Sequence, residues 1–322
     1  MPFHNVLNEG NRNRDQVLQD KLISRFILIE HKYNLVMRLY NLSNSSIMVM
    51  ILVAFFFAYG VLKPGEIVYS RIKEFIYEKN EVCVNYFMRH RDGVPILLSK
   101  YMDLEETCGY IFHFNDSDEA YKTIIDTLSS NLYKWGTIDI GTERVNVLFG
   151  RKPSNGSNYI EDEDDRKCCC GKNDPLFNEG IQLVKDNLES GIFREEKGFF
   201  NLQMNYMLLW SAIDRYCKLR YYRNKEHESR EELSKEKVFR EALNIYAGGK
   251  HYRPIYNTDN LFKNVFDLSN PKYCLNYYYT LRCNIVHRGK SSFSDIDLLM
   301  EATEDLLNIF EYMLDDAFGE DF

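Results

Sequence analysis

Apolar residues recur at helical spacing along the second half of the chain. They stand three or four residues apart in five successive segments, which are 174–190, 195–222, 229–246, 270–288 and 295–315. This spacing gathers the apolar side chains on one side of an α-helix, where they pack against neighbouring helices. The pattern therefore predicts a helical bundle over residues 174–322.

Residues 1–151 are expected to form a mostly helical N-terminal domain with a small β-hairpin. The stretch 116–135 has helical periodicity, with Asp116 or Ser117 as its N-cap. Residues 137–149 alternate in polarity on both sides of Gly141, which is typical of two strands joined by a tight turn. The fold class predicted for the whole chain is thus mainly α.

The longest apolar run, Ile47–Leu62, is predicted to be a helix of this N-terminal domain. It contains no charged residue, and Lys63 and Pro64 follow it. A membrane span usually needs about 18 to 20 such residues. The run is shorter and favours a helix buried inside the protein, with attachment to a membrane as the alternative.

Residues 152–173 are the expected linker between the two domains, because Pro, Gly, Ser and Asn are frequent there and an acidic run follows them. The acidic run 161–165 lacks the alternating ligands and central Gly of a calcium loop. No His or Cys pair stands at ligand spacing beside Cys168, Cys169 and Cys170. We therefore predict no metal and no cofactor, with zinc at the three cysteines as the alternative.

The composition agrees with a globular protein rich in long helices. Of 322 residues, 45% are hydrophobic and 27% charged, and only 17 Gly and 7 Pro interrupt the chain. The formal net charge of -8 argues against a protein that binds any polyanion without selection. Residues 1–20 lack a secretory signal, so we expect a cytoplasmic protein whose eight cysteines are reduced thiols.

One short pattern carries candidate chemistry, an arginine followed after four to six residues by a histidine. About one match is expected by chance, and the chain has three, at Arg25–His31, Arg220–His227 and Arg282–His287. The third lies on a predicted helix that stops at Gly289, a residue suited to the position after a helix end. His287 then stands in the last turn, where the helix dipole favours its charged form. Asn284, one turn before His287, is placed to orient its ring.

The segment 206–216 adds an apolar run, then Trp210, a small residue and Asp214. Together with the helix of Arg282 and His287 and the leucine-rich helix after it, this segment resembles the HEPN domain family of small helical ribonucleases. The resemblance is strongest to the branch found in anti-phage defence proteins, and it covers roughly residues 173–322. Cys283 departs from the family, in which a polar residue usually follows the arginine.

The resemblance implies a metal-independent endoribonuclease that acts as a homodimer. Arg282 and His287 would be its catalytic pair, with Asn284 in support and Asp214 as an orienting acid from across the bundle. His287 would take the proton of the ribose 2′-OH or give one to the leaving 5′-oxygen. Arg282 would hold the phosphate and stabilise its transition state. Such a reaction leaves a 2′,3′-cyclic phosphate and requires RNA, because DNA lacks the 2′-OH.

Basic residues interleaved with tyrosines form the candidate RNA-binding surface of an otherwise acidic chain. With two residues that follow His287, its members are Arg215, Lys218, Arg220, Arg223, Arg288 and Lys290. The alternative is a solvated helix end whose cations complement the helix dipole.

A second function fits the same residues. In it Arg282 pairs with an acid such as Asp214, His287 caps its own helix, and the bundle is a non-catalytic module for binding or dimerisation. The partners predicted for the enzyme are RNA, a second copy of the chain and a protein regulator.

Overall fold

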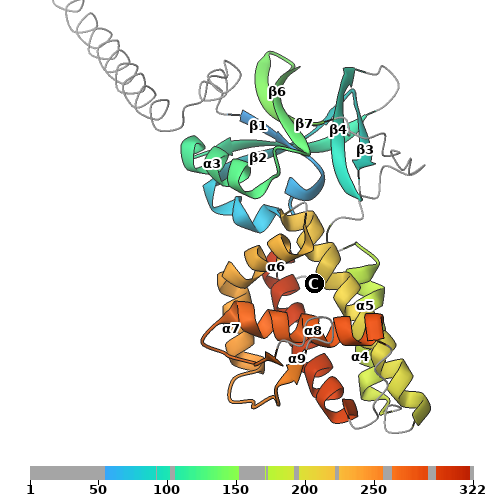
Figure 1. Ribbon diagram of the computed structural model, residues 1–322. Coiled ribbons are helices and arrows are strands. Elements are labelled where there is room, and N and C mark those ends of the chain that lie inside the picture. The colour runs from blue at the N-terminus through green and yellow to red at the C-terminus, as the bar shows by residue number, and fades with distance from the viewer. Residues whose placement is uncertain are drawn as a thin grey trace, which may run out of the picture. The chain divides into compact units, whose positions relative to one another are not determined.

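The computed structural model describes residues 55–91, 93–101, 106–151, 171, 173–191, 196–221, 225–256, 263–288 and 295–319. Strands make up 26% and helices 55% of the residues described. The chain therefore has an α+β fold, and the predicted mainly α fold is wrong. The strands of one large sheet come first along the chain, and the helices of the bundle follow them (Figure 1).

Seven strands form one mixed sheet, and they are β1 (Phe55–Ala58), β2 (Ile76–Val84), β3 (Tyr86–Arg91), β4 (Val94–Tyr101), β5 (Thr107–Phe114), β6 (Tyr133–Ile140) and β7 (Glu143–Gly150). The path through the sheet runs β2-β5-β1-β7-β4-β3, and β6 pairs with β7 beside this path. β6 takes one edge of β7 along its whole length. The other edge of β7 is therefore shared by β1, at residues 146–147, and β4, at residue 149.

The sheet is curled, because β2 and β3 stand at opposite ends of its path although only Asn85 separates them in the chain. One residue spans at most about 3.6 Å, so the two end strands must lie close together. The hydroxyl of Thr107, on β5 beside β2, donates to the backbone oxygen of Tyr86 on β3 at 2.6 Å. The sheet is thus a half-barrel. We call the place where β3, at one end of the path, approaches β2 and β5, at the other end, the seam.

Tyr59 follows the end of β1 and bonds to β4 and β7, near the point where β4 replaces β1 as the strand paired with β7. Its hydroxyl is buried, donates to the backbone oxygen of Leu148 at 2.6 Å and accepts from the N–H of Leu97 at 2.9 Å. β4 and β7 pair directly only at Leu97 and Phe149. The tyrosine hydroxyl therefore supplies hydrogen bonds that the two backbones do not make with each other there.

The apolar run Ile47–Leu62 is not the predicted helix over its described part. Phe55–Ala58 is the strand β1, and Gly60–Leu62 is a short 3-10 helix, η1. β1 lies between β5 and β7, so most of its residues are buried and its sequence shows no polar alternation. Periodicity alone does not distinguish such a strand from a buried helix. Residues 47–54 lie outside the described part.

Two local elements of the first half are predicted correctly. Helix α3 (Ser117–Thr127) begins after Asp116, whose carboxylate accepts from the N–H of Glu119 at 3.1 Å. It ends earlier than the predicted residue 135. β6 and β7 form the predicted hairpin around Gly141, which has a φ of +60°. Two more 3-10 helices, η2 (Tyr69–Arg71) and η3 (Lys73–Phe75), join β1 to β2.

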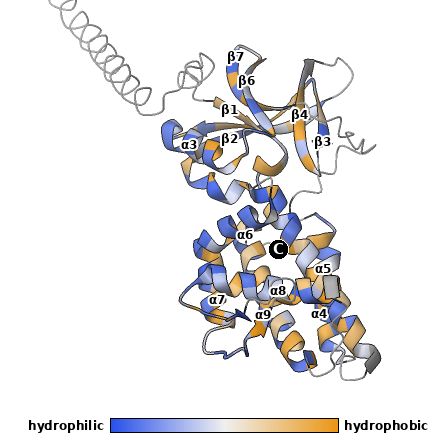
Figure 2. Cartoon of the chain, in the orientation of Figure 1, coloured by the Kyte–Doolittle hydropathy of each residue, from blue (hydrophilic) through white to orange (hydrophobic). Residues whose placement is uncertain are grey.

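The helices of the second half begin and end close to their predicted positions. They are the π-helical turn η4 (Leu176–Gly180) and the α-helices α4 (Ile181–Glu189), α5 (Glu196–Tyr221), α6 (Glu226–Lys235), α7 (Lys237–Tyr246), α8 (Pro271–Arg288) and α9 (Ile296–Phe318). Extended backbone at Glu236 divides the single helix predicted over 229–246. α9 packs against α5 and α7. Each helix of the bundle carries both hydrophobic and hydrophilic residues (Figure 2). A short hairpin of β8 (Ile255–Tyr256) and β9 (Lys263–Asn264) precedes α8.

Cys83 on β2 and Cys108 on β5 form a disulfide. The prediction of reduced thiols is therefore wrong for these two residues, which stand directly opposite each other in the register of the two strands. Register depends on pairing between distant segments, so cysteine spacing could not reveal it. Cys217, Cys274 and Cys283 are free.

The linker predicted at 152–173 stays a prediction, because only Gly171 and Asn173 of it belong to the described residues. Cys168, Cys169 and Cys170 lie outside them. Within the ranges given above, no helix is long and apolar enough to cross a membrane. The same ranges hold no group of three His, Cys, Asp or Glu side chains that could bind a metal ion.

Candidate functional site

Helix α8 carries three of the four residues predicted for the catalytic site, Arg282, Asn284 and His287, and α5 carries the fourth, Asp214. The hydroxyl of Tyr206 on α5 donates to the backbone oxygen of Tyr278 at 2.7 Å and holds α8 against α5. α8 continues to Arg288, so Arg282 and His287 lie on its last two turns, as predicted. The side chains of His287 and Arg288 lie outside the described part.

Arg282 makes no ion pair with any acid of the described residues. Its guanidinium carbon lies 5.6 Å from the centre of the Tyr279 ring. Its Nε is buried and has no hydrogen-bond partner within the described ranges. A buried N–H left in this state costs free energy, and a catalytic role or a bound ion or water often explains it. The ion pair with an acid such as Asp214, expected for a purely structural role, is not formed with any described acid.

Tyr279 is the centre of a cluster that gathers side chains from three helices. The guanidinium carbon of Arg230, on α6, lies 3.5 Å from the centre of the ring, and the ring of Trp210, on α5, meets it edge-on at 5.5 Å. Arg282 approaches the same ring from its own helix. Cations are attracted to aromatic faces, so the ring attracts both guanidinium groups. We call Trp210, Arg230, Tyr279 and Arg282 the Tyr279 cluster.

Asp214, the predicted orienting acid, is on helix α5. It stands one turn after Trp210 on α5 and therefore on the same side of that helix. Burial raises the pKa of the Cys217 thiol, the negative charge of Asp214 raises it further, and the positive charge of Arg230 lowers it. The predicted orienting acid is thus on the face of α5 that carries Trp210, and it does not pair with Arg282.

Asn284 faces away from Arg282. Two positions along a helix correspond to about 160° of separation around its axis. Asn284 is buried, and its Nδ2 donates to the backbone oxygen of Tyr256 at 3.0 Å. This contact joins α8 to β8, and the structure does not bring Asn284 together with Arg282.

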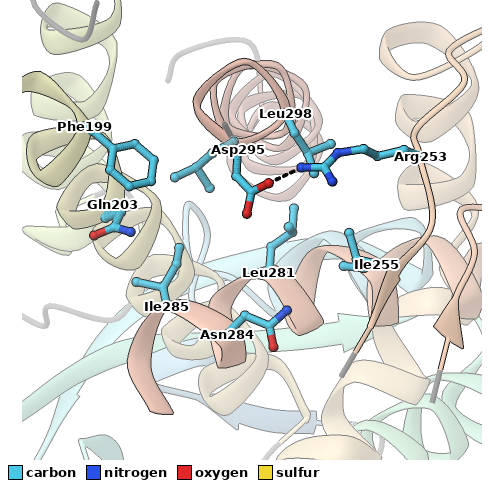
Figure 3. A pocket seen from close by; sticks show the side chains of 10 residues that line it. Phe199, Gln203, Arg253, Ile255, Leu281, Asn284, Ile285, Asp295 and Leu298 are labelled. Carbon is cyan, nitrogen blue, oxygen red and sulfur yellow. Dashed lines mark hydrogen bonds and ion pairs between the residues drawn. The ribbon is translucent and has the colours of Figure 1, made fainter. Parts of the chain in front are cut away.

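A small pocket lies on the Asn284 side of α8 (Figure 3). Leu281, Asn284 and Ile285 line it from α8, and an ion pair between Arg253 and Asp295 lies across it. Its volume is about 30 Å³, which is room for about two water molecules. The pocket is too small for a nucleotide and is not a substrate site.

Two of the predicted RNA-binding residues are engaged inside the molecule. The Nε of Arg220 lies 2.7 Å from Glu236, and its Nη1 donates to the backbone oxygen of Ile67 at 2.6 Å, with only 4% of the side chain exposed. These contacts tie α5 to the end of α6 and to the segment before η2. Arg220 is therefore not on an open surface.

Arg215 is engaged in the same manner. Its Nε lies 2.8 Å from Asp174, and its Nη1 donates to the backbone oxygen of Gly93 at 2.7 Å. Lys218 is partly exposed, while Arg223 and Lys290 lie outside the described residues. Of the predicted basic residues whose side chains the structure describes, Arg215 and Arg220 are thus engaged inside the protein and Lys218 is partly exposed.

Sequence reasoning missed Arg230 and Tyr279. Arg230 stands in the segment EHESREELSK, whose charges are typical of a solvated helix face, yet Arg230 is buried. Tyr279 is one of three adjacent tyrosines, and no spacing rule distinguishes it from the other two. Only the packing of α6 against α8 shows which residues meet.

No family model, no curated protein and no solved structure matches this chain.

Proposed function

We propose that the chain is a metal-independent endoribonuclease with Arg282 and His287 as its catalytic pair. The observation that carries the proposal is the state of Arg282, a half-buried arginine that makes no ion pair with any described acid and lies 5.6 Å from the centre of the Tyr279 ring. An arginine whose charge no acid neutralises can bind an anion such as a phosphodiester. His287 follows it by five residues, in the last turn of the same helix.

The reaction proposed is an attack of the ribose 2′-OH on the adjacent phosphorus. His287 takes the proton of the 2′-OH or donates one to the leaving 5′-oxygen. Arg282 binds the non-bridging oxygens and stabilises the charge that develops on them. The products are a 2′,3′-cyclic phosphate and a free 5′-OH, and no step requires a metal.

Other residues have supporting roles in this proposal. Arg230 and Tyr279 position the Arg282 side chain through their stacked arrangement. Asp214 orients the cationic groups from α5. Asn284 keeps α8 fixed to β8. The proposal includes a cytoplasmic homodimer that acts in antiviral defence, with a protein regulator as a further partner.

The test is cleavage of total RNA and tRNA by the purified chain in the presence of EDTA. Wild type should produce cyclic-phosphate ends, and Arg282→Ala and His287→Ala should each lower the rate by about 100-fold or more. Arg144→Ala and His251→Ala are matched controls, because both residues are exposed and neither belongs to the Tyr279 cluster. Circular dichroism verifies that every variant is folded.

One result would contradict this proposal. If wild type and both variants are folded and cut RNA at the same low rate, also after addition of an extract from phage-infected cells, the chain is not this kind of ribonuclease.

A non-catalytic binding module is the second candidate. Exposed apolar side chains on the same side of α5 favour it, since 59% of Phe200 and 69% of Met204 are accessible. Its test is the oligomeric state of the full chain by light scattering, in wild type and in Met204→Glu. A stable dimer that the substitution disrupts, together with no RNA cleavage, would favour this second function.

A further inference from the structure

The disulfide between Cys83 and Cys108 lies at the outer edge of the curled sheet. β2 is an end strand of the sheet path and pairs only with β5 among the strands described. Cys83 is next to the last residue of β2, and Cys108 is the second residue of β5. The bond therefore crosses the strand pair at the end where the chain turns from β2 into β3.

Both cysteines are exposed, which distinguishes them from the buried free thiols of the bundle. Burial raises the pKa of the Cys274 thiol to about 12 and also raises that of Cys217. A thiol with a raised pKa forms little thiolate and exchanges slowly. Exposed disulfides are the ones that attacking thiolates reach, and they are commonly the labile or regulatory ones.

Apart from the disulfide, few apolar contacts attach β2 to the rest of the protein. Residues Tyr77 to Glu81 are all exposed, and only Val84 of this strand is fully buried. β2 is therefore retained by its ladder with β5 and by the covalent bond. Local opening free energies are low where burial is low. Reduction of the disulfide should therefore lower the free energy of local opening most strongly in β2.

The location of the bond gives its loss a structural consequence. Thr107 and Val84 pair beside the disulfide, and the Thr107 hydroxyl reaches the backbone oxygen of Tyr86 across the seam. The disulfide, the Thr107 contact and the single link residue Asn85 thus lie together where the two ends of the sheet meet. If β2 is attached less firmly to β5, the contacts at the seam are weakened as well.

We propose that the Cys83–Cys108 disulfide is a redox switch, a site of thiol–disulfide exchange for a dithiol reductant that loosens the seam of the sheet. One thiolate of the dithiol attacks a sulfur of the bond and forms a mixed disulfide, and the other Cys sulfur leaves as a thiolate and takes a proton. The second thiol of the reductant, as its thiolate, then displaces the remaining Cys sulfur. The chain ends with two thiols, and the reductant ends as its own disulfide.

The experiment uses the full chain, purified without reductant and equilibrated in buffers of reduced and oxidised dithiothreitol. Free thiols are trapped with a maleimide and assigned by peptide mass mapping, while amide hydrogen exchange is followed in parallel. Cys83 and Cys108 should be unreactive before reduction and become reactive together while the chain stays folded. Exchange across Val82–Val84 should then be about tenfold faster or more, with α9 unchanged.

Two variants separate the bond from other effects of the reductant. The double variant Cys83→Ser and Cys108→Ser should show the fast exchange at Val82–Val84 without any reductant, and Cys283→Ser should behave as wild type. If the double variant does not fold, the reduced wild type still supplies the comparison.

Three results would overturn the proposal. In the first, Cys83 and Cys108 react with maleimide before any reductant is added. In the second, they are reduced only at denaturant concentrations that unfold the chain. In the third, the bond is reduced but exchange in β2 does not change.

Discussion

Replacement of Tyr59 by phenylalanine tests how the sheet is joined between β4 and β7. The ring stays and keeps its stacking on Phe57, whose centroid lies 6.2 Å away. Only the hydroxyl is lost, with its bonds to Leu148 and to the N–H of Leu97. Each net hydrogen bond contributes about 1 kcal/mol, and a buried N–H left unsatisfied costs about 1 to 3 kcal/mol. Leu97 is fully buried, so we expect a loss of about 3 kcal/mol in the free energy of unfolding.

Two other tyrosines provide matched controls for the same substitution. The buried hydroxyl of Tyr133 donates to the backbone oxygen of Pro95 at 2.9 Å, and loss of this bond in Tyr133→Phe should cost about 1 kcal/mol. Tyr77 is 64% exposed, and Tyr77→Phe should change stability by less than about 0.5 kcal/mol. Urea unfolding followed by tryptophan fluorescence and circular dichroism measures all three. Amide exchange at Leu97 reports the lost bond directly.

Equal stability of Tyr59→Phe and Tyr77→Phe within about 0.5 kcal/mol would contradict this role of the Tyr59 hydroxyl. Wild-type protection of the Leu97 amide in the Tyr59→Phe variant would contradict it as well. Either result would mean that another group satisfies the gap between β4 and β7.

Two further predictions concern the buried ionisable side chains of Glu66 and Arg220. Burial, with a smaller effect from the charge of Asp174, raises the pKa of Glu66 to about 8. The native state then holds a proton that the unfolded chain releases, so the free energy of unfolding should fall between about pH 5 and pH 8, by up to about 1.4 kcal/mol per pH unit. Urea unfolding at several pH values should show this slope in wild type and a smaller one in Glu66→Gln; equal slopes would contradict the assignment. Arg220→Ala leaves the carboxylate of Glu236, which is 10% exposed, without its cation and should lose about 3 to 5 kcal/mol. Thermal and urea unfolding should show no such loss in the control Arg144→Ala, whose ion pair with Asp139 is exposed; comparable losses in both would speak against a buried role for Arg220.

Elements whose signals are local were predictable. α3 follows from the carboxylate of Asp116 and the apolar positions after it, and the hairpin follows from alternation around Gly141. The helices of the bundle follow from apolar spacing in the same manner, including the end of α8 beyond His287. In each case residues within a few positions of one another contain the information.

The strands of the first half were not predictable by the same reasoning. β1 is apolar throughout because it lies between two other strands. β2 contains the consecutive polar residues Glu78–Glu81 because it is an end strand with little burial. Neither shows the alternation that identifies a half-buried strand, so both were assigned to a mostly helical domain.

For the candidate site too, the local features were predictable and the contacts between helices were not. Sequence reasoning placed Arg282 and His287 on the last turns of one helix, because their spacing and Gly289 are local features. It did not show that Arg282 approaches Tyr279 and Arg230, or that Asn284 faces β8. Those contacts depend on how three helices pack.

Local sequence is enough to specify the helices of the bundle, the N-cap of α3 and the hairpin of β6 and β7, because each depends on neighbouring residues. The disulfide of Cys83 with Cys108, the bonds of Tyr59 between β4 and β7 and the burial of Arg220 follow instead from tertiary packing. These contacts join residues far apart in the chain. Their formation depends on strand register and helix packing, which the fold as a whole determines.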